Sequence, residues 1–150
     1  MLAQHQAMID KFSAAYAELT AEKIAHFPDL YADDVVFMDP VQQIYSVQEL
    51  QVYFFRIIEQ TYYHRVKVIR AFSSDNDVFI LWELSYAHAN LEQGDDISVE
   101  GASHLRLEGE RIIFQRNYYD MGAMLYEHIP LISRVVHYMK GKIAGFNRND

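Results

Sequence analysis

Apolar residues repeat every three or four positions over most of residues 1–62 and at every second position afterwards, which predicts helices followed by strands. The first helix should occupy the first twenty residues, with apolar positions at Ile9, Phe12, Tyr16 and Leu19. A second, shorter helix continues the pattern through Ile24, Phe27, Leu30 and Tyr31. Pro28 should kink this second helix or begin its last turn. A third helix should begin at the capping box Ser46–Glu49 and end near Tyr62.

A short strand interrupts the helices and ends in a candidate functional residue. Asp33 and Asp34 should break the preceding helix, and Val35–Met38 then form a buried strand. Pro40 stops this strand because proline has no N–H to donate to a sheet. Asp39 therefore lies at the strand end, where its carboxylate can point into the interior as a base. The alternative is an aspartate that only bonds the backbone of the turn at Pro40.

The period of two in the second half of the chain predicts four further strands. They run from His64 to a turn at Ser73–Asp77, and then over Val78–Asn90, Ile97–Leu107 and Arg111–Tyr119. The last two strands should be joined by a tight turn at Gly109. Segregated helices followed by antiparallel strands predict an α+β fold, in which a curved antiparallel sheet wraps the helices.

The long strand Val78–Asn90 is apolar on both faces, so both faces should be covered. One face carries the apolar stripe Trp82, Leu84 and Tyr86. We place this stripe on the outer face of the sheet, where it predicts homodimerisation. Glu83 then points inward and is a candidate ligand contact. The alternative is a structural ion pair of Glu83 with Arg106 or Arg116.

The last strand carries polar residues on one face. Gln115, Asn117 and Tyr119 share that face by the period of two, and they could hydrogen-bond a ligand. Alternatively, they satisfy an irregular sheet edge. Ser103, on the neighbouring strand, could donate to the same ligand, or it is a small residue that allows close packing.

We expect one domain over residues 1–150, in which residues 131–150 form a helical C-terminal tail. Asp120 should cap a short helix over residues 121–128, and Pro130 should end that helix. The tail alternates basic and apolar residues, a pattern that can contact an anionic membrane. A tail that docks on its own dimer or frays is the alternative, and we expect no membrane contact.

Composition excludes several functions. The net charge is −8, and the acidic body should repel nucleic acid. The chain has no Cys, and its 7 His lack metal-ligand spacing, so we expect no metal and no cofactor. No apolar run approaches the ~20 residues of a membrane span and no signal peptide is visible, so we expect a cytoplasmic protein. The 9 Phe, 11 Tyr and 1 Trp suit a lined cavity or an apolar self-association surface.

Three stretches together resemble the NTF2-like superfamily, and most closely its SnoaL-like branch. They are Leu30–Pro40, Gly101–Leu107 and Ile113–Asp120. The resemblance implies a cone-shaped, cystatin-like α+β barrel in which a curved antiparallel sheet wraps around three N-terminal helices, and a dimer formed through the outer sheet face. Members include ketosteroid isomerase, limonene epoxide hydrolase, polyketide cyclases, dehydratases and non-enzymatic binding modules, so the fold alone does not decide the chemistry.

The resemblance also implies roles for single residues. Asp39 matches the general-base aspartate of ketosteroid isomerase. Ser103 falls where that enzyme has its protonated aspartate donor, and Tyr16 lies near its tyrosine donor without being clearly equivalent. Where the epoxide hydrolase has its aspartate, arginine, aspartate set, this chain has Ser85, Glu83 and Asn117. The Asn117 amide cannot take up a proton as a base, so the chain departs from that mechanism.

Two hypotheses for the function follow. In the first, a small hydrophobic molecule of polyketide, steroid or terpene type binds in an internal cavity, and Asp39 moves a proton in an isomerase, cyclase or dehydratase reaction. The second is a non-catalytic dimeric module that binds a ligand or a protein. The candidate ligand contacts are Tyr16, Glu83, Ser103, Gln115, Asn117 and Tyr119.

Overall fold

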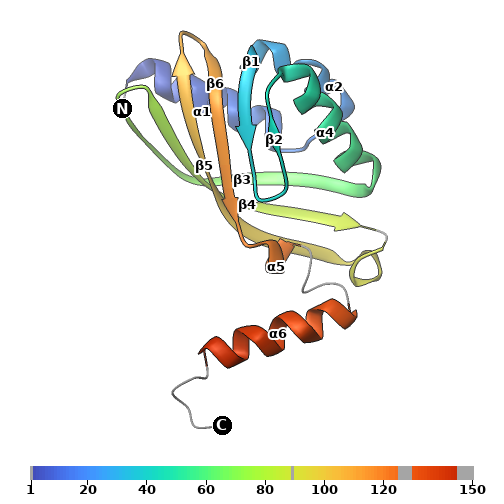
Figure 1. Ribbon diagram of the computed structural model, residues 1–150. Helices are drawn as coiled ribbons and strands as arrows, with labels where there is room; N and C mark the ends of the chain where they lie inside the picture. The colour runs from blue at the N-terminus through green and yellow to red at the C-terminus, as the bar shows by residue number, and fades with distance from the viewer. Residues whose placement is uncertain (1, 89, 125–129, 145–150) are drawn as a thin grey trace.

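The computed structural model describes residues 2–88, 90–124 and 130–144. The N-terminal helices cover one face of a curved sheet (Figure 1), and the α+β class is as predicted. In chain order the elements are α1 (Ala3–Tyr16), α2 (Ala21–Ala25), α3 (Phe27–Leu30), β1 (Tyr31–Met38), β2 (Gln43–Ile44), α4 (Val47–Glu59), β3 (Thr61–Ser74), β4 (Asp77–His88), the short 3-10 helix η1 (Glu92–Gly94), β5 (Asp96–Glu108), β6 (Arg111–Tyr119), α5 (Met121–Met124) and α6 (Pro130–Ala144).

The described strands form one sheet in the order β2-β1-β6-β5-β4-β3. The four strands β3 to β6 pair in antiparallel succession, as expected. β1 pairs with β6 in parallel, so the sheet is antiparallel except at this one pairing. No tight turn joins β1 to β6, because α4 and four strands lie between them in the chain, and their relative direction is therefore not fixed by a hairpin. β2 and β3 form the two edges, so the sheet is open rather than a closed barrel.

The first strand is longer than predicted. β1 begins at Tyr31 rather than at Val35, and Asp33 and Asp34 belong to it. The register with β6 shifts between Tyr31 and Val36, so the two exposed aspartates lie in an irregular stretch of the pairing. The acidic pair therefore marks a bulge in a strand and not the break between a helix and a strand.

The helix starts follow their capping residues. Thr20 accepts a hydrogen bond from the backbone N–H of Lys23 and begins α2. Pro28 lies in the first turn of α3, so the second predicted helix is in fact two short ones. At α4 the predicted cap is confirmed: the Ser46 hydroxyl accepts from the N–H of Glu49 at 3.1 Å.

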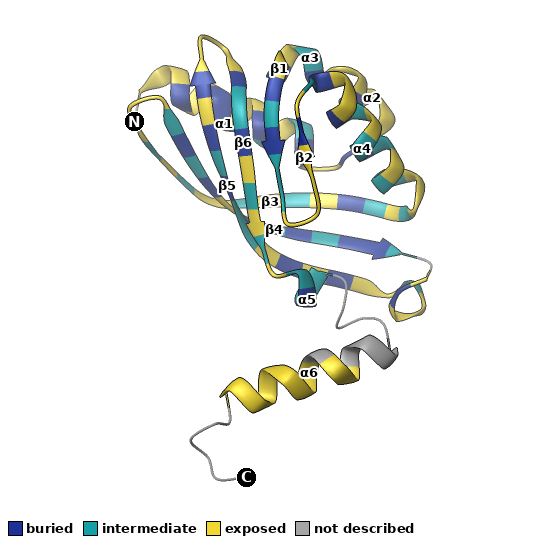
Figure 2. Ribbon diagram, viewed as in Figure 1, coloured by how far each residue is buried: buried dark blue, intermediate teal, exposed yellow. Residues whose placement is uncertain are grey.

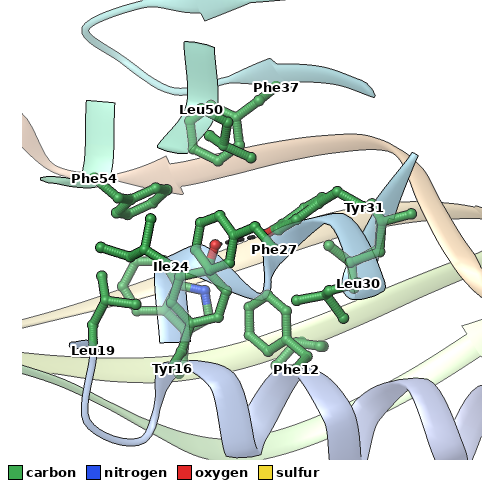
Figure 3. Close-up of a cluster of buried hydrophobic side chains, with 14 of the residues drawn as sticks. Phe12, Tyr16, Leu19, Ile24, Phe27, Leu30, Tyr31, Phe37, Leu50 and Phe54 are labelled. Atoms are coloured by element: carbon green, nitrogen blue, oxygen red, sulfur yellow. Dashed lines mark hydrogen bonds between the residues drawn. The ribbon is translucent and has the colours of Figure 1, made fainter. Parts of the chain in front are cut away.

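The hydrophobic core fills the space between these helices and the sheet face that they cover. Figure 2 shows the buried residues along the facing sides of both layers. Phe27, Tyr31, Phe37 and Leu50 are almost wholly inaccessible to solvent. Figure 3 shows how their side chains meet those of α1 and α4. Because these side chains interlock between two layers, the core fixes the position of each helix on the sheet.

The two faces of β4 are the reverse of the prediction. Trp82, Leu84 and Tyr86 are buried, with exposed fractions of 6%, 5% and 6%, and face the helices. Leu81 is 39% exposed and points to the outer face, as does Glu83. Alternation along a strand separates its two sets of side chains but does not say which set faces the core when both are apolar.

The C-terminal region is described in part. Asp120 accepts a hydrogen bond from the N–H of Gly122 and caps α5, as predicted, while residues 125–128 of the expected helix lie outside the described residues. α6 occupies Pro130–Ala144 of the tail, and Lys140 of α6 bonds the carboxylate of Asp120 at 3.0 Å. Among the described helices, none combines the length and apolarity that crossing a membrane requires.

Candidate functional site

A cavity of about 70 Å³ lies between the helices and the covered face of the sheet. A wider pocket of about 260 Å³ shares six of its lining residues, so the two adjoin. Among the described residues, neither wall contains Lys or Arg. The inner cavity is lined by Phe12, Tyr16, Asp39, Tyr53, Phe54, Ile57, His64, Val66, Trp82, Leu84, Ser103, Gln115, Asn117, Tyr119 and Met124.

Asn117 is the meeting point of a hydrogen-bond network on the sheet side of the cavity. Ser103 lies directly across from it on β5, and the Ser103 hydroxyl donates to Asn117 Oδ1 at 2.6 Å. The indole N–H of Trp82 donates to the Ser103 hydroxyl at 2.8 Å. Gln115, two residues away on the same face of β6, donates from Nε2 to the same Asn117 oxygen at 2.9 Å. Three strands therefore contribute to one connected group.

The network continues from the sheet to the helices through two tyrosines. Tyr31 donates its hydroxyl to Gln115 Oε1 at 2.6 Å, and the hydroxyls of Tyr16 and Tyr31 lie 2.5 Å apart, a bond drawn as a dashed line in Figure 3. Burial raises the pKa of Tyr16 and is also the main cause that raises the pKa of Tyr31. Both phenols therefore keep their protons at neutral pH, and the whole network is uncharged.

Asp39 forms a second polar cluster at the cavity wall. Its Oδ1 accepts the backbone N–H groups of Val41 and Gln42, each at 2.8 Å, and so holds the turn between β1 and β2. Its Oδ2 accepts the hydroxyl of Tyr53 at 2.5 Å, and Tyr119 interacts with both Asp39 and Tyr53. Both of the roles weighed for Asp39 are therefore structurally possible, because one oxygen bonds the turn and the residue also lines the cavity.

The two phenols beside Asp39 both stay protonated. Burial, followed by the hydrogen bond to Asp39, raises the pKa of Tyr53. Burial, followed by the charge of Asp39, raises the pKa of Tyr119. Neither phenol ionises near neutral pH, because a phenolate there would be desolvated and would lie beside a carboxylate.

His64 is a buried residue of the site that the sequence analysis missed. Its Nδ1 is inaccessible and has no hydrogen-bond partner in the described residues. Burial lowers the pKa of His64 to about 4, so the ring is neutral at pH 7. His64 shares one face of β3 with Val66 and Val68, and this position on an apolar face was the available signal. Tyr53 was not among the predicted ligand contacts, and Trp82 was assigned to the wrong face.

The structure brings together six of the predicted site residues and separates one. The wall of the cavity contains Tyr16, Asp39, Ser103, Gln115, Asn117 and Tyr119. Glu83 lies on the other face of β4, across from Lys67 of β3 and Glu100 of β5, so it does not line the cavity. The alternative ion pair of Glu83 with Arg106 or Arg116 is also absent from the described contacts: Arg106 bonds Asp77, and Arg116 lies over the ring of Tyr118. A charged side chain is far less costly on this solvent-facing side than in the cavity.

Comparison with known proteins gives a consistent family. The family model described as a SnoaL-like domain matches residues 12–115. A structure from Catenulispora acidiphila, a hypothetical protein with a ketosteroid isomerase-like fold in complex with trimethylamine, has a TM-score of 0.70 at 16% identity and covers 81% of this chain and 91% of its own. An NTF2-like protein of unknown function from Burkholderia pseudomallei has a TM-score of 0.72 at 12% identity and covers 83% and 96%.

A third similar structure is an epoxide hydrolase of M. tuberculosis, described as LEH-like. It has a TM-score of 0.67 at 15% identity and covers 83% of this chain and 84% of its own. These low identities establish the fold and not the reaction. A search of curated protein sequences finds no match. The family model spans more than half of the chain, in agreement with the sequence resemblance, and this chain therefore belongs to the SnoaL-like domain family.

Proposed function

We propose that this protein binds a small, mostly apolar molecule with an oxygen-containing group in the cavity, and that Asp39 takes up a proton from it. The reaction would be of the isomerase, cyclase or dehydratase type. The observation that carries this proposal is the convergence of Asp39 and the Asn117 network on one otherwise uncharged wall. A carboxylate beside a substrate C–H and a hydrogen-bond donor beside its carbonyl are the groups that such a proton transfer needs.

The roles within the site differ from one residue to another. Ser103 and Gln115 already use the hydrogen bonds described above to hold the Asn117 amide, so they are positioning residues in this proposal. Tyr53 and Tyr119 surround the carboxylate of Asp39 and would orient it toward the bound molecule. Tyr16 would contribute an apolar ring to the wall. The polar contact with the bound molecule is then left to Asn117.

A specific observation also supports a non-catalytic binding module. The Oδ1 atom of Asp39 holds the β1–β2 turn, and Asn117 cannot act as a base.

We also propose that the protein is one cytoplasmic domain and dimerises through the outer sheet face. The exposed side chains Phe72, Leu81 and Tyr118 on that face support the dimer. The sedimentation of the purified protein tests the dimer.

Proton transfer can be tested before the natural substrate is known. Apolar ketones that raise the melting temperature of the protein are incubated with it in D₂O, and ¹H NMR follows the loss of the signal from the hydrogens next to the carbonyl. We expect the wild type to accelerate this exchange and Asp39→Asn to reduce the acceleration by at least ~100-fold. Asparagine keeps an oxygen for the two turn N–H groups, so the fold should persist.

The matched control is Asp33→Asn, the same change at an exposed position of β1. It should exchange at the wild-type rate. If ketones bind but Asp39→Asn exchanges as fast as the wild type, the catalytic role is wrong. If ketones bind and the wild type does not accelerate exchange at all, the non-catalytic module is the correct alternative.

A further inference from the structure

We propose that Asn117 presents its NH₂ group to the cavity as a fixed hydrogen-bond donor, and that the molecule bound there is a neutral carbonyl compound. This inference rests on the proposed function, because it assumes that the cavity binds a small molecule, and it names the chemical class of that molecule. The question is which end of the Asn117 amide faces the cavity, its oxygen or its NH₂ group. The direction of the hydrogen bonds in the network answers it.

The indole of Trp82 sets that direction. Its N–H can only donate, so the Ser103 oxygen must accept from it at 2.8 Å. The Ser103 oxygen could accept a second bond, but its one hydrogen would then have no acceptor among the described residues. Its remaining partner is the Asn117 amide at 2.6 Å, a length typical of an O–H donor and short for an N–H donor. Ser103 therefore donates to Asn117. The amide must turn its oxygen, and not its nitrogen, toward Ser103.

The rest of the network follows from this one orientation. The Asn117 oxygen is also 2.9 Å from the side-chain amide of Gln115, which must therefore turn its NH₂ group toward Asn117. Gln115 Oε1 is then left to accept the hydroxyl of Tyr31. Since Tyr31 has used its hydrogen, Tyr16 must donate to Tyr31 in turn. Every donor and acceptor in this series of hydrogen bonds fits a single direction, and this makes the network rigid.

One hydrogen-bond donor of this network has no partner. The NH₂ group of Asn117 points away from Ser103 and Gln115, and it has no hydrogen-bond acceptor among the described residues. Asn117 is half-buried and lines the cavity. Its two hydrogens are therefore offered to whatever occupies the cavity, and a donor in such a place favours an acceptor on the bound molecule.

The charges of the wall select a neutral acceptor. Among the described residues the cavity has no Lys or Arg, and Asp39 contributes a negative charge. A carboxylate or phosphate would lack a cation and would be repelled by Asp39. The Tyr53 hydroxyl already donates to Asp39, and Tyr119 interacts with Asp39 and Tyr53. A ketone, aldehyde or ester fits these conditions, since its oxygen accepts and carries no charge.

The test uses three compounds of similar shape: acetophenone, which only accepts, 1-phenylethanol, which accepts and donates, and ethylbenzene, which does neither. Their Kd values are measured by NMR titration of the wild type and of Asn117→Asp, which keeps the oxygen that Ser103 and Gln115 bond but turns a second oxygen toward the cavity. We expect the Kd ratio of acetophenone to 1-phenylethanol to rise about fivefold or more in Asn117→Asp, while ethylbenzene changes little. Asn76→Asp, at an exposed turn, is the control and should leave all three unchanged.

The ligand-free protein gives an independent reading. In its ¹⁵N NMR spectrum the side-chain NH₂ protons of Gln115 should be protected from exchange with water, and those of Asn117 should exchange faster. The reverse would mean that the network runs the other way and would overturn the inference. An unchanged Kd ratio in Asn117→Asp would also overturn the inference. The proposed function would still stand in that case, because the compounds bind. If none of the three compounds binds the wild type, the proposed function fails, and the inference with it.

Discussion

The two faces of strands β4 to β6 both carry hydrogen-bonded polar side chains, but the side chains are of different kinds. On the covered face, Trp82, Ser103 and Asn117 are neutral and bond one another. On the outer face, Asp77 accepts bonds from His104 at 2.8 Å and from Arg106 at 3.1 Å. Neighbours in sequence, such as Ser103 and His104, therefore belong to different chemical environments.

The difference shows how burial selects the type of polar group. Away from water, a charged group is too costly unless it is paired, so the covered face uses amides, hydroxyls and an indole that satisfy each other. The outer face can hold charges because water solvates them, and Arg106 is accordingly the main cause that lowers the pKa of Asp77. Changes on the covered face should therefore cost more stability than the same changes outside. Two of the three experiments below make that comparison directly, and the third measures the cost of a charge on the covered face.

The largest effect is expected where the covered face is most tightly packed. Gly101 lies across from Trp82, and a Cβ at Gly101 would lie 2.3 Å from an atom of its ring. Gly101→Ala should displace the indole and lower the free energy of unfolding by about 3 kcal/mol, measured by urea denaturation. It should also weaken the preference for ketones. Gly141→Ala is the control, because among the described residues a Cβ there would meet no heavy atom within 4 Å beyond its own helix backbone and chain neighbours, so stability should stay equal or rise slightly. Equal stability of the two variants would contradict this packing argument.

The next effect is a pH dependence that arises from His64. Its pKa is lowered to about 4 in the folded protein, against about 6.5 in the unfolded chain, so the unfolded state binds the proton more readily between these values. His64 therefore makes stability fall as the pH is lowered through this window, by about 2 kcal/mol between pH 7 and pH 5. His64→Phe, which keeps an aromatic ring beside Phe54, should lose this part of the slope. If urea unfolding of the variant shows the slope of the wild type, His64 is not its cause.

The smallest effect compares one chemical change on two faces. Tyr31→Phe removes the hydroxyl that links Tyr16 to Gln115 and leaves buried groups without a partner, so it should cost about 1.5 kcal/mol. Tyr63→Phe removes a hydroxyl that bonds Asp96 at the surface, where water replaces it, and should cost less than about 0.5 kcal/mol. Thermal unfolding of both variants measures the difference. Equal costs would mean that the buried Tyr31 hydroxyl contributes no more to stability than the exposed Tyr63 hydroxyl.

Much of the architecture could be predicted from the sequence. The cap at Ser46, the period of three to four in α1 and α4, and the period of two from β3 onward are local signals, and they placed these elements correctly. The grouping of Gln115, Asn117 and Tyr119 on one face of β6 also follows from local geometry. The parallel pairing of β1 with β6 did not follow, because it joins strands that are distant in the chain.

The candidate site, like the fold, could be predicted from the sequence only in part. The residue types were visible in the sequence, and so was the position of Asp39 at the end of a strand. Which face of β4 is covered was not visible, because both faces are apolar, and Glu83 was therefore assigned to the cavity and Trp82 to the outside. The roles of His64 and Tyr53 depend on contacts between separate elements.

By itself, the sequence determined the elements of this protein and the sets of side chains that share a face, since both depend on residues a few positions apart. Only the tertiary structure decided which face meets the helices and which way the Asn117 amide points. The physical reason is that the helices exclude water from one side of the sheet. There the donor-only indole of Trp82 and the single hydroxyl hydrogen of Ser103 together set the direction of the hydrogen bonds connected to them.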